Sequence, residues 1–295
     1  MSGMAVTDHG NMMGIKEFFD VANKKNGPVN DEIKALKKRL NGVTDEQERL
    51  GIQLQIEEAK KKLFVPIFGC EVYCARRTLY DKDKNIDADK SGWHLILLAK
   101  NEKGYHNLIK IVSKGWTEGF YHRPRTDKHE LQKYHEGLIV CSACIGGEVP
   151  KKILAGRISE AEDAIQWFKG IWGEDYYLEI QRHKATVQRA NHETYPLQVT
   201  VNAKLLELAR KYNVKVVCTN DVHFVDEENA EAHDRLICLS TSRDLDDPTR
   251  MLYTKQEWFK TKAEMNALFA DVPESLSNTI EILHKVETYA IERAP

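Results

Sequence analysis

The sequence predicts an α/β fold in which strand–helix units surround a largely parallel sheet or barrel. Short runs rich in β-branched and aromatic residues alternate with amphipathic stretches, as in WHLILLA followed by KGYHNLIKIVSKGW and GLIVCS followed by SEAEDAIQWFKGIW. Three of the strand-like runs also end in clusters of titratable residues. In folds of this class, function gathers where the strands end. We therefore expect one site, assembled from several strand ends.

Bulk composition limits the class of protein. The 295 residues, 42% of them hydrophobic, suffice for one large domain or two small ones. No apolar run reaches membrane-spanning length and the N-terminus is unlike a signal peptide, so we expect a cytoplasmic protein with no membrane partner. The six cysteines lie mostly in apolar runs and imply no disulfide framework. A net charge of -2 argues against a non-specific nucleic-acid coat, so a DNA substrate would need a local site.

One segment, residues 29–62, interrupts the strand–helix alternation. It is dense in charge and places Ile33, Leu36 and Leu40, then Leu50, Leu54 and Ile56, at helical spacing. This pattern predicts an inserted helical hairpin with its turn at Asn41-Gly42 and a capping box of Thr44 with Gln47. A surface insertion with a solvated face is favoured over a dedicated binding arm.

The C-terminal residues form a second distinct segment. PESLSNTIEILHKVETYAIERAP predicts a final amphipathic helix. We assign residues 1–270 to the main domain and 271–295 to this helix and the start of a linker. The chain ends without a capping tail, which leads us to expect a further domain beyond Pro295.

The titratable clusters at strand ends predict the site. They are Thr7 to Gly10, Gln181 to His183 and Asn220 to His223. Any one alone is better explained by a polar loop, but three together indicate a shared site. Asp221 and His223, which are the predicted catalytic pair, lie two apart, and in a strand this spacing sends both side chains to one face. A carboxylate beside an imidazole suits a metal ion with an open position.

Four further residues lie in comparable contexts and extend the candidate ligand set. They are His9, Glu71, His94 and Cys144. Nitrogen and sulfur donors favour zinc, with manganese or iron as alternatives, over an all-oxygen magnesium site. Each has a structural alternative: Glu71 as a paired edge-strand acid, His94 as a core histidine, and Cys144 as a small buried residue. His94 opens its strand-like run, whereas sites in such barrels collect at strand ends. Either that strand runs in a different direction or its expected boundary is wrong.

Seven segments carry a resemblance to a known family. They are TDHGNMMG, IFGCEVY, HLILLAKNEKGYHNLIKIVS, EGFYHRPR, GLIVCSACIGGEVP, YYLEIQRH and TNDVHFVDEENAEAHDRLICLSTSRDLDDPTR. Together they closely resemble the polymerase-and-histidinol-phosphatase (PHP) domain of bacterial DNA polymerase III alpha subunits. The resemblance spans nearly the whole chain except the hairpin at 29–62.

The resemblance implies a fold and a ligand set. The family fold is a distorted barrel of βα units that holds up to three metal ions. By motif, His9, Glu71, His94, Cys144, Asp221 and His223 are implied metal ligands, and Asp8 is implied to orient a ligating histidine. The family's opening strand with its H-x-H pair has no match here. We therefore expect a first strand to be missing and the metal cluster and its activity to be impaired.

The resemblance also implies a function. Where its site is complete, the family hydrolyses phosphodiesters with metal assistance, as a 3′-to-5′ exonuclease in some replicative polymerases, whereas in others the domain braces the polymerase and its partner subunits. The implied partners are a DNA 3′ end, polymerase domains of the parent chain and other replicase subunits. The parent is implied to be a DNA-directed DNA polymerase, with polymerising aspartates downstream of Pro295. A free-standing small-molecule phosphatase is the remaining alternative.

Three basic residues are candidates to hold the substrate phosphate. Arg125 lies in the HRPR loop, and Arg182 with His183 follows a strand. A guanidinium fork matches phosphate oxygens, but it matches a carboxylate equally well. An ordinary structural ion pair is therefore the competing interpretation.

Overall fold

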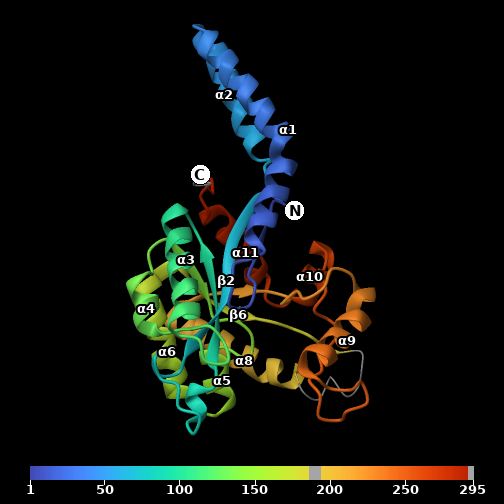
Figure 1. The fold of residues 1–295 in the computed structure, drawn as a ribbon. Helices are drawn as coiled ribbons and strands as arrows, with labels where there is room; N and C mark the ends of the chain where they lie inside the picture. Colours follow the sequence, from blue (N-terminus) through green and yellow to red (C-terminus); the bar gives the residue numbers. More distant parts are fainter. Residues whose placement is uncertain (186–193, 292–295) are drawn as a thin grey trace.

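A mixed sheet organises the molecule. The computed structural model describes residues 1–185 and 194–291. Its seven-stranded sheet has the order β1-β2-β3-β5-β6-β7, with β4 beside β2. Helices surround this half-barrel, which confirms the predicted α/β class (Figure 1). The strands are β1 (Gly3–Val6), β2 (Val65–Ala75), β3 (Gly92–Ala99), β4 (Arg125–Thr126), β5 (Leu138–Cys141), β6 (Tyr176–Ile180) and β7 (Lys215–Cys218).

Strand direction explains the position of His94. β3 pairs antiparallel with both β2 and β5, whereas all other strand pairs in the sheet are parallel. The start of β3 therefore lies at the edge where the other strands end. His94, opposite Tyr73 of β2, reaches that edge from a reversed strand. The expectation of a largely parallel sheet holds, with this one exception.

Each face of the sheet has its own apolar cluster, because successive side chains of a strand point to opposite faces. The larger cluster joins one set of strand residues, such as Leu97 and Leu178, to helices on the outer face. The smaller cluster joins the alternate residues, such as Leu98 and Tyr177, to Ile282 of α11. By this alternation Glu71 and His94 lie on the face of the smaller cluster. That face therefore carries apolar packing at one end and polar residues at the other.

The helices cover the sheet from both sides. α3 contacts β3 and β4, α6 contacts β5 and β6, and α8 contacts β6 and β7. The helices after the hairpin are α3 (Glu102–Thr117), α4 (Lys128–Lys133), α5 (Glu148–Leu154), α6 (Ile158–Trp172), α8 (Tyr195–Tyr212), α9 (Ala230–Thr241), α10 (Lys262–Leu268) and α11 (Pro273–Lys285), with short 3-10 turns at Asp87–Asp89, Gly173–Asp175 and Glu227–Asn229. No helix in the described part of the chain is long and apolar enough to cross a membrane.

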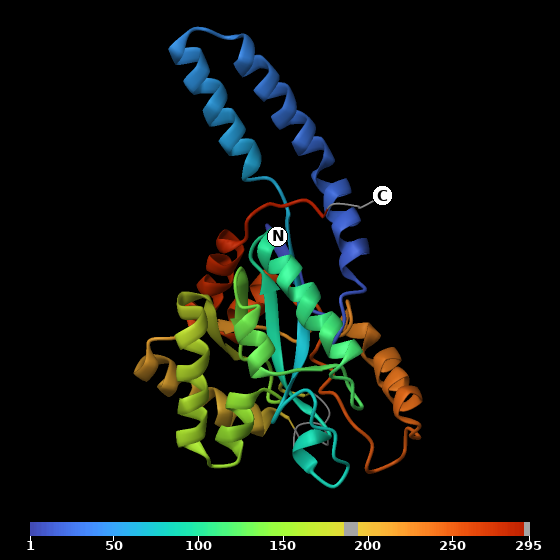
Figure 2. The ribbon, with the colours of Figure 1, turned by 60° about the vertical axis from the view of Figure 1, so that its left-hand side comes forward.

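The predicted hairpin is present but begins earlier than expected. α1 (Ile15–Gly42) runs unbroken through Pro28 and returns as α2 (Glu46–Lys60), so that the pair projects from the body (Figure 2). The Pro28 ring removes a helical hydrogen bond. Packing of the following turns against α2 offsets this loss, and the expected boundary at residue 29 was therefore wrong.

The contact face and the cap of the hairpin also differ from the prediction. Ile52, Ile56 and Ala59 of α2 face α1, whereas Leu50 and Leu54 are exposed. The cap is shifted by one residue from the predicted Thr44: the Asp45 carboxylate accepts a hydrogen bond from the Glu48 amide at 2.8 Å. At the base of the hairpin, the Asn26 side chain makes two hydrogen bonds with the backbone of Phe64, both 2.8 Å long.

The predicted C-terminal helix is α11, and it packs on the sheet. It lies beside β7, and the Asn278 side chain donates to the Val216 carbonyl at 2.8 Å. Ile282 is buried, whereas Ile280 is half exposed. The division at residue 270 stays a prediction, and residues 292–295 of that segment lie outside the described part of the chain.

Candidate metal centre

The predicted ligands meet at the edge where most strands end. His9 follows β1, Cys144 follows β5, and Asp221 and His223 follow β7, while Glu71 lies within the long strand β2. Bridges between His9 and Glu71, and between His94 and Gly147, extend the sheet at this edge. The six residues, far apart in the sequence, form a continuous arc of contacts.

Glu71 lies at the middle of this arc. Its Oε1 atom is 2.5 Å from Nδ1 of His94, and its Oε2 atom is 3.4 Å from Nδ1 of His9. The carboxylate is buried, whereas the His9 ring is 44% exposed. Each carboxylate oxygen thus faces a different imidazole.

Cys144 closes one end of the arc. Its Sγ atom lies 3.5 Å from Nδ1 of His94 and accepts a hydrogen bond from the Gly146 amide at 3.4 Å. The ligand atoms of Glu71, His94 and Cys144 all lie within 4.8 Å of one another. Cys141, three residues earlier, instead packs in the smaller apolar cluster. The structure thus brings Cys144, not Cys141, to the arc.

Asp221 and His223 close the other end, but not by the predicted strand geometry. Nε2 of His223 lies 3.4 Å from Nε2 of His9, and the Asp221 carboxylate lies 3.9 Å from Nδ1 of His223. β7 ends at Cys218, and Asp221 has a left-handed φ of 45°. A turn, rather than strand alternation, therefore places the two side chains together. The His223 amide donates to the Glu257 carbonyl at 2.8 Å, which holds the turn.

The pKa values of the two carboxylates in the arc, Glu71 and Asp221, shift in opposite directions. Burial acts to raise the pKa of Glu71, but the His94, His9 and His223 rings hold that pKa below its usual range. Burial and the nearby Glu71 carboxylate raise the pKa of Asp221. Burial, Glu71 and Asp221 raise the pKa of the Cys144 thiol. The raised pKa values of Asp221 and Cys144 are the expected consequence of crowding acidic groups into one buried cluster, and a cation would relieve them.

The donor set fits a transition-metal ion. Glu71 Oε1 is buried without a well-formed hydrogen bond, although an imidazole nitrogen and a thiol sulfur lie close by. Buried charged atoms are normally paired or coordinate a metal. Imidazole, thiolate and carboxylate together suit zinc, manganese or iron. The structure therefore contains a candidate Glu–His–Cys metal site, with His9, Asp221 and His223 beside it.

Asp8 occupies a structural position. Its Oδ2 atom accepts a hydrogen bond from the Gly14 amide at 2.9 Å, just before α1 begins. The carboxylate thus fixes the chain between β1 and the hairpin. Within the described residues it makes no hydrogen bond to a histidine ring, so the orienting role implied by resemblance lacks structural support.

The predicted phosphate-binding role of Arg125 was wrong. The residue is fully buried, and its guanidinium donates to the carbonyls of Gly119, Asp89, Leu79 and Asp81. A buried cation with its donors engaged cannot reach a substrate. Arg125 instead ties the 79–89 loop to the end of α3.

Arg182 and His183 also serve the fold. Arg182 forms a two-bond ion pair with Asp271, at 2.6 and 2.8 Å, and donates to the Leu268 carbonyl. His183 is buried, with one ring nitrogen 3.0 Å from the Asn220 carbonyl and the other 2.9 Å from the Gln198 amide. The ion-pair interpretation therefore replaces phosphate binding for Arg182, and both His183 nitrogens are engaged.

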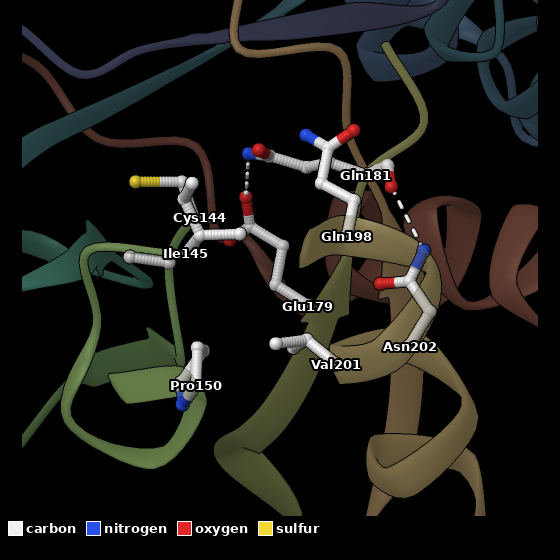
Figure 3. Close-up of a pocket in the computed structure, with 9 residues that line it drawn as sticks. Cys144, Ile145, Pro150, Glu179, Gln181, Gln198, Val201 and Asn202 are labelled. Atoms are coloured by element: carbon white, nitrogen blue, oxygen red, sulfur yellow. Dashed lines mark hydrogen bonds between the residues drawn. The ribbon is translucent and has the colours of Figure 1, made fainter. Parts of the chain in front are cut away.

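Three residues beside the arc were not predicted. The Tyr253 hydroxyl lies 3.3 Å from Nε2 of His223, and the His233 ring lies 5.5 Å from that of His223. Glu179, in the apolar run of β6, is buried and lines a small pocket together with Cys144 (Figure 3). A lone acid within an apolar strand was the one sequence signal for Glu179. Tyr253 and His233 carried none, because only folding brings the Tyr253 loop and the helix α9 that carries His233 to His223.

The fold and the site define an α/β half-barrel with a candidate metal centre at its strand ends. The family model of the PHP domain matches residues 1–183, more than half of the chain. The chain therefore belongs to the PHP domain family, and its half-barrel is of the distorted PHP type. The family is metal-dependent, in agreement with the donors at this edge.

Comparison with individual bacterial proteins shows which members of the family this chain is similar to. The chain is 38% identical to DNA polymerase III subunit alpha of Borreliella burgdorferi over 99% of its own length and 21% of that protein. It is 33% identical to the Thermus aquaticus subunit, over 95% of this chain and 19% of that protein, and 32% identical to the Treponema pallidum subunit, over 96% and 20%. The chain is thus homologous to DNA polymerase III alpha subunits and spans about one fifth of their length.

Proposed function

We propose that this chain is the PHP domain of a replicative DNA polymerase III alpha subunit and hydrolyses phosphodiester bonds at DNA 3′ ends. The observation that carries the proposal is the meeting of Glu71, His94 and Cys144, with His9 and the Asp221–His223 turn beside them. The curated relatives, which are replicative polymerases by name, support a role in DNA replication. Other replicase subunits and the polymerase domains of a parent chain are the expected partners.

The six candidate ligands divide into two groups, each of which would hold one cation. His94, Cys144 and one oxygen of Glu71 would hold one divalent cation, preferably zinc, while the other Glu71 oxygen, His9 and the Asp221–His223 pair would hold a second. Bound cations would activate a water molecule for attack and neutralise charge on the leaving oxygen. The exposed His9 side of the arc is where a phosphodiester can approach. The Asp221 carbonyl, 2.7 Å from Nδ1 of His223, would orient that ring and leave Nε2 to the cation.

Metal analysis with a nuclease assay tests the proposal. Because the H-x-H motif of the family has no match in this chain, the purified chain is expected to retain zinc or manganese at less than full occupancy after dialysis. It is expected to shorten a single-stranded DNA from its 3′ end only slowly in the presence of that metal. Glu71→Gln is expected to lose at least about tenfold in metal affinity and to lose hydrolysis. Glu130→Gln is the matched control, because Glu130 is a buried acid paired with Lys114 away from the arc.

A further variant, Asp221→Asn, separates hydrolysis from the alternative role of bracing the polymerase. If the centre is structural only, Asp221→Asn lowers the melting temperature while no 3′-end hydrolysis is seen in any chain. If it hydrolyses DNA, Asp221→Asn abolishes shortening of the DNA. Absence of bound metal after incubation with zinc, manganese or iron would refute both the metal centre and the proposed hydrolysis.

A further inference from the structure

Glu179 is a buried acid close to the arc that is not itself one of the six candidate ligands. It lies on β6, on the same face of the sheet as Glu71, and is 5% exposed. Its Oε1 atom accepts hydrogen bonds from the Thr219 hydroxyl at 2.5 Å and from the Gln181 amide at 3.0 Å. Its Oε2 atom is buried and has no hydrogen-bond partner. Burying an ionised carboxylate in this way costs folding free energy unless the group is paired or protonated.

The surroundings of Glu179 connect both ends of the arc. Thr219, which donates to the carboxylate, lies two residues before Asp221. On the other side, Glu179 and Cys144 line one pocket with Gln181, Gln198 and Asn202, and the Glu179 carboxylate lies between Gln181 and the Cys144 loop in Figure 3. The Glu179 amide also donates to the Ser142 hydroxyl at 2.8 Å, two residues before Cys144.

The chemistry of the carboxyl group favours a neutral hydrogen-bonding role. Burial raises its pKa to about 7, and the Asp221 and Glu71 carboxylates contribute to the rise, although hydrogen bonds from Thr219 and Gln181 oppose it. A protonated carboxyl group leaves no unpaired charge at Oε2 and keeps Oε1 as the acceptor for Thr219. A glutamine side chain has the same shape and the same acceptor.

We propose that Glu179 is a positioning residue of the metal centre, which sets the Cys144 loop and the Asp221–His223 turn at the separation that metal binding requires. The inference rests on the proposed function, because it assumes the metal centre. It assigns to Glu179 no contact with the ion or with the DNA. Its effect passes through Thr219 to Asp221 and through pocket packing to Cys144.

Cobalt(II) titration of the full 295-residue chain tests the proposal. Cobalt bound by a thiolate gives a near-ultraviolet charge-transfer band, which reports whether Cys144 is in place. Glu179→Ala is expected to lower cobalt affinity by about tenfold or more and to weaken this band per bound ion. Thr219→Val is expected to lower the affinity in the same direction. Glu179→Gln is expected to restore affinity and band to near the values of the unsubstituted chain.

Two controls make the outcome decisive. Glu130→Ala removes a buried acid away from the arc, so its melting temperature measures the general cost of such a loss. Unchanged affinity in Glu179→Ala, or a loss matched by Glu130→Ala at equal melting temperature, would overturn the positioning role. An equal loss in Glu179→Gln would also overturn it, since a direct ligand or a needed charge would then be indicated. If the unsubstituted chain binds no cobalt, the metal centre itself fails.

Discussion

Glu71 and His94 lie on neighbouring strands that run in opposite directions, and their side chains meet at 2.5 Å. Glu71 is paired in register with Ile96, so His94 is its diagonal neighbour on the same face. This contact depends on β3 being reversed. If β3 ran parallel to β2, His94 at its start would lie at the opposite edge of the sheet, far from the Asp221–His223 turn.

Replacing the Cys144 thiol should change which metal ion the site prefers more than it changes the number of ions bound. Cys144→Ser is expected to lower zinc affinity by at least about tenfold while affecting manganese less, because a thiolate favours softer ions. Competition titrations with zinc and manganese measure the two affinities. Cys238→Ser is the control, because Cys238 is a buried cysteine on α9 and is not among the candidate ligands. Unchanged affinities for both metals would show that Cys144 is not a ligand.

Stability of the metal-free chain should depend on pH through Glu179. Its pKa is raised in the folded state to about 7, so the native chain keeps a proton that the unfolded chain releases above about 4.5. This stabilisation is complete below pH 4.5 and is lost as pH rises towards 7, by at most roughly 3 kcal/mol. Urea unfolding at pH 5 and pH 8, with chelator, measures it. Glu179→Gln should show a smaller fall, and identical falls would contradict the prediction.

Arg125 should matter for folding and not for DNA. Arg125→Met leaves four carbonyl oxygens without their donor, and a loss of about 3 kcal/mol or more in unfolding free energy is expected. Denaturant unfolding gives the value. By comparison, Asp271→Asn weakens the more exposed Arg182 pair and should cost about 1 kcal/mol or less. Similar costs for the two variants would argue against this assignment.

The hairpin should be removable beyond its base. Asn26 and Phe64 are joined by two hydrogen bonds, so a short glycine-containing turn can replace residues 29–62 without moving the body. The shortened chain is expected to bind metal as tightly as the full chain, because the hairpin core of Ile33, Ile52 and Ile56 is separate from the two clusters on the sheet. Metal titration and circular dichroism check this. A loss of metal binding would show that the hairpin supports the site.

The sequence predicted more of the fold than of the way in which the side chains of the site are positioned. Alternating strand and helix patterns predicted the α/β class, since burial imposes those periods directly. The six candidate ligands followed from motifs. Spacing nevertheless misassigned how Asp221 and His223 meet, because a turn with positive φ leaves no periodic pattern in the sequence. Phosphate binding was predicted for Arg125 and Arg182 because the sequence alone does not distinguish an arginine that binds phosphate from one that pairs within the protein. The partners of each guanidinium make the distinction.

The hairpin also affects the order in which the chain can fold. β1 pairs in parallel with β2, and the whole hairpin lies between Gly3 and Val65. A flexible connection of that length would make the pairing entropically slow. Because α1 and α2 can associate through local contacts and return the chain to Phe64 beside Asn26, the effective loop that must close is far shorter. The hairpin can thus act as an early folding unit that brings the first two strands together.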